Sequence, residues 1–363
     1  MVGAGMESEH KTTGFSHQDF ALKTAMAEIN LPAELILYIV DCLIPSNPGH
    51  LVTRTLLSLT LVCKLISKTA RRLLIKHCLQ IDSTHRLNRV LRRSALSTTR
   101  GNLPRQPSSI GLFLSPFLDN LNVPSTVCQI DCLTNIICNS LTRLVIDMPL
   151  RDLWPEDDHQ QFRPVLRAAF ARLTQLEEFC SVRDELYLDT VEEIAEPEVW
   201  SFWPRLRHLA LYNAAVHDSR FIKGLCQCPN LTHLVLVRPD GLPDKVPADR
   251  MDKDFLPSFQ RLIIVNSGSG FSQSTPFDQE MWEETFVGRL HTLRSPGDGE
   301  IGDSDLQAGS VVSYLSLRIP FGGEDDEIKL CQEWLSEQAT SGRLWEISDD
   351  HQSFPYSIHD SAF

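Results

Sequence analysis

The chain has 363 residues, of which 42% are hydrophobic and 22% are charged, and its formal net charge is −13. This length allows one large domain or two to three small ones, and the composition is ordinary for a globular protein. No apolar run reaches the roughly 18 residues of a membrane-spanning helix, and residues 1–20 lack the layout of a signal peptide. Without such a signal, the ten scattered cysteines are expected to be reduced, in the cytoplasm, the nucleus or both.

The charge is spread unevenly along the sequence. Residues 1–30 carry two bases and four acids, whereas residues 31–110 carry twelve bases and only three acids. Residues 111–363 therefore carry a net charge of −20, whereas the net charge of the whole chain is −13. This asymmetry predicts units with different partners. The predicted parts are a disordered tail (1–28), a helical unit (29–81), a basic linker or basic helix (82–109), a leucine-rich unit (110–347) and a C-terminal tail (348–363).

A first helix is predicted within residues 29–45, and it is apolar around most of its circumference. Pro32 suits a first helical turn and Pro45 ends the segment, while Glu34 and Asp41 share the one polar stripe. A surface helix needs an apolar stripe of only about 100°. Either this helix is buried in a large core, or it packs on its own domain with one face and on a partner with the other. Helical periodicity continues over residues 54–77, followed by a candidate short strand at 78–82.

From residue 110 onward, a leucine pattern recurs. The form L-x-x-L-x-L, or a variant of it, begins at positions 141, 173, 206, 231, 259, 290 and 312. Self-similarity at such intervals is typical of a solenoid in which each repeat contributes one short strand. Apolar segments at 131–140, 162–172 and 219–228 predict helices on the other side of those strands. The alternative is an ordinary α/β domain with leucine-rich strands.

The helical unit contains a recognisable set of residues. Residues 31–35 read Leu-Pro-Ala-Glu-Leu, residues 59–64 read Leu-Thr-Leu-Val-Cys-Lys, and Ala70, Leu74 and Ile81 follow. As a set they resemble an F-box. One departure is the segment Leu-Ile-Ser at 65–67, where many members carry an aromatic residue, and it leads us to expect a lower adaptor affinity.

The remainder of the chain resembles the irregular leucine-rich repeats that often follow an F-box. The fold class implied is α+β, with a small all-α F-box followed by an irregular α/β leucine-rich-repeat solenoid. The resemblance implies a non-catalytic substrate-recognition subunit of an SCF-type cullin–RING ubiquitin ligase. Its F-box would dock on the adaptor subunit through Leu31, Pro32, Leu35, Ile39, Leu43, Leu59, Val62 and Cys63. The basic balance of residues 31–110 would steer the unit towards an acidic adaptor.

Two other function classes stay open at this point. One is a non-catalytic leucine-rich scaffold that acts outside a ubiquitin ligase. The other is a hydrolase or transferase with an unrecognised site, which the motifs do not favour. The segment GDGEIG at 297–302 matches G-x-G-x-x-G, but its acidic residues would repel phosphates and no helix evidently begins there.

Motifs for metal and nucleic-acid binding are also weak. Cys128 and Cys132, like Cys226 and Cys228, do not form the matched C-x2-C pairs of a zinc site. The basic run 71–93 lacks the interleaved aromatic residues of a nucleic-acid surface. We therefore expect no cofactor, no metal, no membrane partner and no nucleic-acid partner.

The position just before the second leucine of each repeat predicts where a protein substrate would bind. In a leucine-rich repeat, such strand positions line the concave face. Here they are Arg143, Gln175, His208, His233, Arg261, Thr292 and Tyr314, with Tyr212 and Arg318 beside them. Basic side chains in such an acidic region favour a stripe for an acidic or phosphorylated peptide. The alternative is a set of merely solvated polar positions. The candidate substrate-binding residues are Arg143, His208, Tyr212, His233, Arg261, Tyr314 and Arg318.

Overall fold

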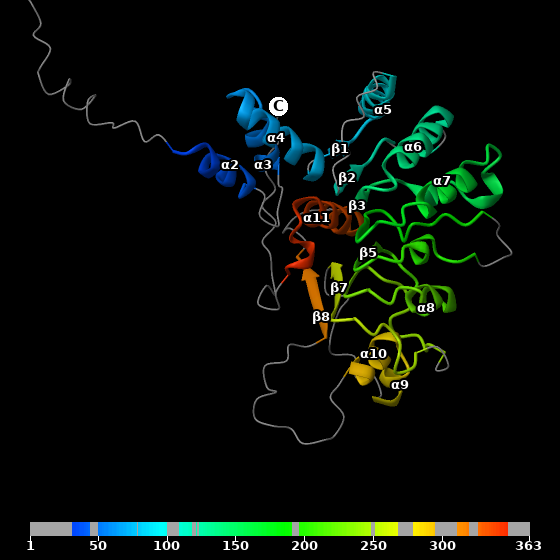
Figure 1. The fold of residues 1–363 in the computed structure, drawn as a ribbon. Coiled ribbons are helices and arrows are strands. Elements are labelled where there is room, and N and C mark those ends of the chain that lie inside the picture. Colours follow the sequence, from blue (N-terminus) through cyan, green and yellow to red (C-terminus); the bar gives the residue numbers. More distant parts are fainter. Residues whose placement is uncertain are drawn as a thin grey trace, which may run out of the picture.

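The computed structural model has both helices and strands, with a small helical unit followed by an open parallel sheet (Figure 1). It describes residues 31–43, 50–77, 79–99, 109–117, 121, 123–190, 196–247, 251–267, 279–294, 311–318 and 326–347. The predicted tails at 1–28 and 348–363 lie outside the described residues, as does the glycine-rich segment 297–302. Among the described residues, no helix combines the length and the apolarity needed to cross a membrane.

The helical unit consists of α2 (Ala33–Asp41), α3 (His50–Leu59) and α4 (Lys64–His77). The periodic segment 54–77 is thus divided in two. The Thr60 hydroxyl donates to the Leu57 carbonyl at 2.6 Å, and the Leu61 amide donates to the Ser58 carbonyl at 3.0 Å. These local bonds end α3 in a tight turn before α4 begins.

A small apolar cluster holds the three helices together. Val40, Leu56, Ala70 and Leu73 are buried at its centre, so each helix contributes at least one side chain. Leu43 and Leu59 pack against this cluster while staying partly exposed. The unit therefore has a core of its own, separate from that of the sheet.

Eight strands form the sheet, and their spatial order follows the chain, with every neighbouring pair parallel. Parallel neighbours require crossover connections, which the intervening helices and turns supply. The strands are β1 (Leu79–Ile81), β2 (Ile110–Leu114), β3 (Leu141–Ile146), β4 (Glu178–Ser181), β5 (His208–Tyr212), β6 (His233–Val237), β7 (Arg261–Ser267) and β8 (Val312–Leu317).

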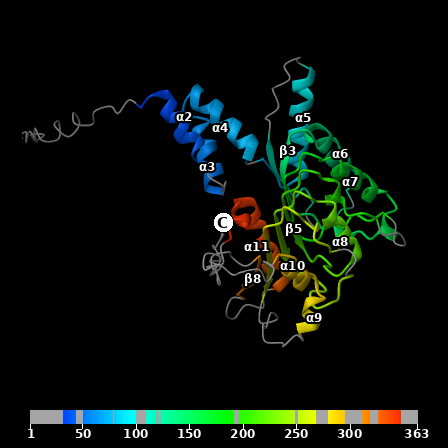
Figure 2. The same ribbon diagram turned by 60° about the horizontal axis from the view of Figure 1, so that its bottom comes forward.

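One face of the sheet is covered by the helices that connect the strands (Figures 1 and 2). They include α6 (Pro124–Ile137), α7 (Phe162–Ala171) and α8 (Ser219–Cys226), which confirm the three predicted helical segments. Short 3-10 turns complete the layer. The remaining elements on this side are α5 (Thr84–Thr99), η1 (Leu150–Asp152), η2 (Pro155–Asp157), η3 (Val199–Phe202), α9 (Gln279–Glu283) and α10 (Phe286–Arg294).

The recurring leucines form the core between this layer and the sheet. Phe179 of β4 pairs in register with Leu144 of β3 and with Leu209 of β5. Leu209 in turn pairs with Leu234 of β6, and all four side chains are buried in one cluster. Burying each such side chain contributes about 1.5–3 kcal/mol. The leucine pattern therefore predicted correctly which side of the strands faces the larger core.

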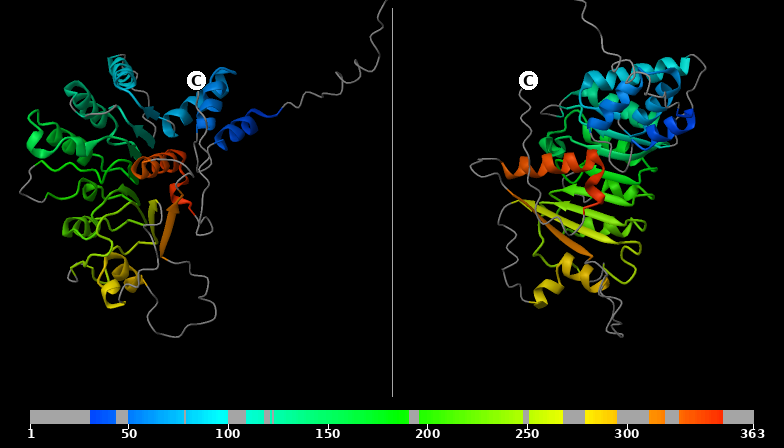
Figure 3. Two further views of the ribbon diagram at one scale, coloured as in Figure 1. Left: turned by 180° about the vertical axis from the view of Figure 1, so that it is seen from behind. Right: turned by 90° about the vertical axis from the view of Figure 1, so that its left-hand side faces the viewer.

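On the other face of the sheet, the central strands are covered by the long helix α11 (Glu327–Ser341), which is followed by the short turn η7 (Arg343–Trp345) (Figure 3). Cys331, Trp334 and Leu335 of α11 are buried against strand residues such as Val235 and Ile263. This second apolar cluster shows that the face opposite the leucines is occupied over its central strands.

The sheet begins earlier in the chain than the sequence predicted. β1 pairs with β2, and Ile81 and Leu87 are fully buried in the larger core. The predicted boundary at residue 81 therefore falls inside the sheet. Segment 82–109 contains helix α5, so the basic helix, and not the linker, is the correct one of the two structures predicted for it. Leu87, Val90 and Leu91 lie at helical spacing and give α5 an apolar face against this core.

Two predicted strands differ from the structure. In the repeat that begins at Leu173, the strand starts only at Glu178, since Phe179 takes the register position that Leu144 and Leu209 hold in neighbouring strands. The repeat at 290 is part of α10, because its L-x-x-L spacing also fits one turn of a helix.

Candidate protein-binding surfaces

An exposed apolar face covers one side of the helical unit. On α2, Leu35 is 48% exposed and Ile39 is 51% exposed, while Val40 on the opposite side is 3% exposed. The face continues N-terminally onto Leu31 and Pro32, both exposed. α2 thus packs on its own unit with the Val40 side, while Leu35 and Ile39 remain about half exposed on the other side.

The turn between α3 and α4 presents further apolar side chains to solvent. Leu61 is 86% exposed and Val62 is 62% exposed, and Cys63 beside them is also exposed. Large apolar residues in such positions mark interaction sites when they gather, because single-chain proteins rarely leave extended apolar patches uncovered. We call Leu31, Leu35, Ile39, Leu61 and Val62 the apolar docking face.

Two of the residues predicted to bind an adaptor are placed differently. Leu43 and Leu59 are only partly exposed and pack against the internal cluster of the helical unit. They support the helices that carry the docking face and contribute less surface to it. Leu61, which the set of predicted residues omits, is the most exposed large apolar residue of the unit.

Basic residues accompany the docking face on α4. Lys64, Lys68 and Arg71 are exposed, and Arg72 forms an ion pair with Asp41 of α2 at 3.0 Å. An exposed pair of this kind contributes little to stability. The unit thus combines apolar and cationic surface, as the uneven charge of the sequence indicated.

The second predicted surface follows one row of side chains across the sheet. Arg143, Glu178, His208, His233 and Arg261 lie in register on adjacent strands β3 to β7. The row confirms the predicted alignment of both histidines and of two arginines. Glu178 takes the position in the row that was predicted for Gln175. The sequence indicates this shift through Phe179, which stands one residue later than the repeat pattern requires.

The C-terminal segment covers this row. The Trp345 ring stacks on the His208 ring with centroids 5.0 Å apart and an angle of 29° between planes. Trp345 Nε1 also donates to Glu178 Oε2 at 3.2 Å. The Arg261 guanidinium donates to the Ile347 carbonyl, and to Ser313 Oγ at 3.1 Å. Two of the predicted substrate-binding side chains, His208 and Arg261, are therefore engaged within the chain.

Electrostatics within the row are largely compensated. Burial by itself would raise the pKa of Glu178. The His208 ring, whose Nδ1 lies 3.6 Å from Glu178 Oε1, the charge of Arg143 and the Trp345 donor outweigh burial and lower the pKa. Burial, followed by the neighbouring charges of His208 and Arg261, lowers the pKa of His233. The Arg143 guanidinium lies 3.5 Å from the His77 carbonyl of α4. The row acts as an internal polar network.

The other predicted substrate residues do not join the row. Tyr212 is on the same face but is buried in the α11 cluster, so it is not presented to a partner. Tyr314 pairs in register with Ile264, a residue of the leucine-side core, and so lies on the opposite face of the sheet. Arg318 is exposed just beyond β8, and Thr292 belongs to helix α10.

No metal centre is evident in the part of the chain that the structure describes. That part contains no group of three or more histidine, cysteine, aspartate or glutamate residues able to hold a metal ion. Cys128, Cys132 and Cys226 are exposed, and Cys228 is buried. Burial raises the pKa of the Cys228 thiol to about 12, which disfavours the thiolate that a metal would need.

Comparison of the chain with protein-family models and with curated proteins found no match. The assignment of a function therefore depends on the two surfaces described above.

Proposed function

We propose that this chain is the substrate-recognition subunit of an SCF-type E3 ubiquitin ligase. In this proposal α2, α3 and α4 form an F-box that docks on the adaptor subunit. The parallel sheet and its helices form an irregular leucine-rich-repeat solenoid that holds a protein substrate. In this proposal the chain supplies no catalytic group, and other subunits transfer the ubiquitin.

The observation that carries the proposal is the apolar docking face. Leu31, Leu35, Ile39 and Val62 were predicted as adaptor contacts from the resemblance of the sequence, and all four are exposed. Exposure of such an apolar face to water is unfavourable in free energy. A partner with a matching apolar surface would bury the face and remove this penalty. The cationic residues of α4 would guide an acidic partner to it.

The alternative is a non-catalytic scaffold that acts outside a ubiquitin ligase. The covered row on the sheet favours a scaffold, because Trp345 and Ile347 already contact the side chains that were predicted to bind a substrate. A scaffold would still bind a partner through the docking face, but that partner would not be a ligase adaptor.

Copurification separates the two functions. The full chain is coexpressed with the adaptor subunit of a cullin–RING ligase and isolated through a tag on the chain. We expect the adaptor to be retained at micromolar concentration, together with the cullin when it is added. An isolated chain without adaptor would contradict the ligase function and favour the scaffold.

A further inference from the structure

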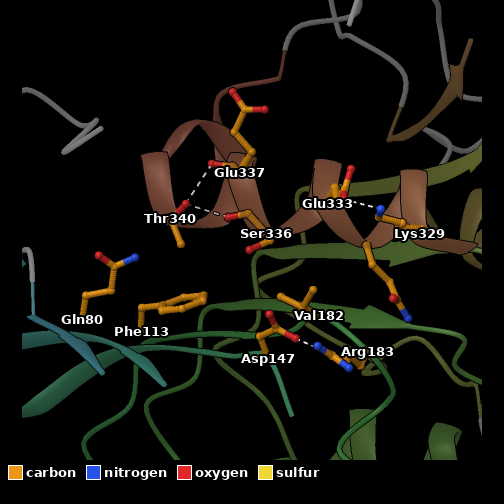
Figure 4. Close-up of a pocket in the computed structure, with 11 residues that line it drawn as sticks. Gln80, Phe113, Asp147, Val182, Arg183, Lys329, Glu333, Ser336, Glu337 and Thr340 are labelled. Carbon is orange, nitrogen blue, oxygen red and sulfur yellow. Dashed lines mark hydrogen bonds and ion pairs between the residues drawn. The ribbon is translucent and has the colours of Figure 1, made fainter. Parts of the chain in front are cut away.

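A cavity of about 600 Å³ lies between α11 and the strands at the β1 end of the sheet (Figure 4). Its volume falls within the range of about 300–1,000 Å³ that is usual for ligand sites. Gln80, Phe113 and Val182 line it from the strand side, and Gln332 and Ser336 line it from the helix. It is on the same face as the covered row, and its strand-side residues come from β1, from β2 and from the segments that follow β3 and β4.

The strand side of the cavity offers an apolar contact. Phe113 of β2 is half-buried and packs at the edge of the cluster beneath α11, and Val182, just after β4, is buried. Figure 4 shows the Phe113 ring on the strand side of the cavity, opposite Ser336 on the helix. An apolar side chain of a ligand could rest on this ring without disturbing the cluster.

Three polar side chains around the cavity make no hydrogen bond to another described residue. They are the amides of Gln80 and Gln332 and the hydroxyl of Ser336, all lining residues. Each amide can both donate and accept, and the hydroxyl can do the same. Peptide backbone needs alternating donors and acceptors, so this set suits an extended peptide segment.

Charges inside the cavity are compensated, and acids stand at its outer rim. Asp147 is paired with Arg183 at the base of the cavity. Glu333 lies 3.7 Å from Lys329, and Glu337 lies 3.2 Å from an Arg343 nitrogen, with both carboxylates about half exposed. Figure 4 shows Glu337 extending away from the strands. Exposed pairs of this kind are worth about 0–1 kcal/mol, so a ligand cation can exchange with the present partner.

We propose that this cavity holds an extended peptide segment of the protein substrate, with an apolar side chain on Phe113 and a lysine or arginine facing Glu333 and Glu337. The proposal rests on the proposed function, since it names the class of substrate that the receptor takes. It reverses the charge expected from the row of Arg143, His208 and Arg261. The two half-exposed carboxylates at the rim favour a basic segment there.

The test uses the full chain and an array of random heptapeptides, followed by fluorescence anisotropy with two selected or designed peptides. One peptide carries an apolar residue flanked by lysine or arginine, and the other carries the same apolar residue flanked by glutamate. We expect the basic peptide to bind at least about tenfold more tightly than the acidic one. Tighter binding of the acidic peptide, or equal binding of both, would overturn the proposal.

Variants locate the binding. Ser336→Arg fills the cavity from the helix and should weaken the binding of the basic peptide at least about tenfold. The double variant E333R/E337R should weaken the binding of the basic peptide by a similar factor, and it should not weaken the binding of the acidic peptide. Glu156→Arg, an exposed acid on η2, is the matched control and should change binding by less than about twofold. Unchanged binding in Ser336→Arg would place the peptide elsewhere and overturn the proposal.

Two further measurements complete the test. Adaptor retention is measured on the same samples, so a chain that binds the adaptor but no basic peptide contradicts this inference alone. A chain that binds the basic peptide but no adaptor contradicts the ligase function alone. If a chain ending at residue 347 binds the peptide about tenfold more tightly than the full chain, residues 348–363 compete with the peptide for the cavity. That result would overturn the proposal that the cavity of the full chain is open to a substrate.

Discussion

Trp345 lies flat on His208 and donates a hydrogen bond to Glu178, the neighbour of His208 in the row across the sheet. The contact joins the last described turn of the chain to the centre of the sheet. It fixes the segment after α11 over side chains that the sequence predicted to bind a substrate. Trp345 is thus the residue through which the C-terminal segment closes this part of the face.

Removing the Trp345 side chain tests that closure. Trp345→Ala loses the stacking and leaves Glu178 with one donor fewer, so we expect unfolding to require about 1–3 kcal/mol less free energy. Trp345→Phe keeps a ring over His208 and should lose only part of that amount. Urea denaturation of both variants provides the measurement. Equal stability of Trp345→Ala and the unaltered chain would show that the contact is incidental.

Arg163 is the most deeply buried cation of the described residues, and it holds together the loops that follow β3 and β4. Its guanidinium donates to the carbonyls of Leu150, Leu153, Tyr187 and Asp189. Arg163→Met would leave these oxygens without a donor, so we expect a loss of about 3–5 kcal/mol.

Arg163→Lys should not restore the stability, because an ammonium group cannot reproduce the planar fork of the guanidinium. Arg205→Met, at an exposed position, is the control and should lie within about 0.5 kcal/mol of the unaltered chain. Denaturant titrations of the three variants check this. A fully stable Arg163→Met variant would contradict the role given to the cation.

Glu198 makes the stability of the fold depend on pH. Burial is the largest cause that raises its pKa to about 8, and the charge of Arg220 lowers it only in part. The folded chain therefore holds a proton that the unfolded chain releases near its ordinary value of 4.5. Stability from this group is complete below pH 4.5 and falls as the pH rises towards 8.

Glu198→Gln removes that dependence, because a glutamine does not titrate. We expect the free energy of unfolding of the variant to change less between pH 5 and pH 8. Thermal unfolding at several pH values measures the difference between the two chains. Parallel pH profiles for both would contradict the raised pKa.

Gly224 of α8 allows Trp200 to pack closely against the helix. A Cβ atom built at Gly224 would lie 2.5 Å from Trp200 Cη2, and Trp200 is fully buried. Gly224→Ala should therefore cost about 1–3 kcal/mol through overpacking, although alanine favours a helix in itself. A stabilised variant in a melting experiment would show that the tryptophan can move aside.

The part of the fold that the sequence predicted best is the part governed by local repetition. Leu144, Leu209 and Leu234 recur at matched positions, and their burial follows from the alternation of side chains along a strand. The same spacing failed at Leu290, since two leucines three residues apart satisfy a helix equally well. The start of β4 lies later than predicted, because Phe179 occupies the register position that a leucine holds in the neighbouring strands.

The covering of the sheet by α11 could not be predicted from repetition. It depends on contacts such as those of Trp345 with Glu178 and His208, which join segments far apart in the chain. No local pattern indicates which face of the sheet a terminal helix will choose. The exposed side of α2 could not be predicted from its helical pattern either, because a helix that is apolar around most of its circumference does not indicate which face turns inward. The exposure of Leu35 and Ile39 was implied only by the resemblance of the sequence.

The most direct test of the proposed function is the affinity of the full chain for the adaptor subunit of a cullin–RING ligase, measured by titration calorimetry. The double variant L35D/I39D places two charges in the apolar docking face without touching the buried Val40, and Phe202→Asp, at an exposed apolar site on η3, is its matched control. We predict a micromolar or tighter complex for the unaltered chain and the control, and a loss of at least about a hundredfold for the double variant. No binding by the unaltered chain, or equal binding by the double variant, would contradict the account.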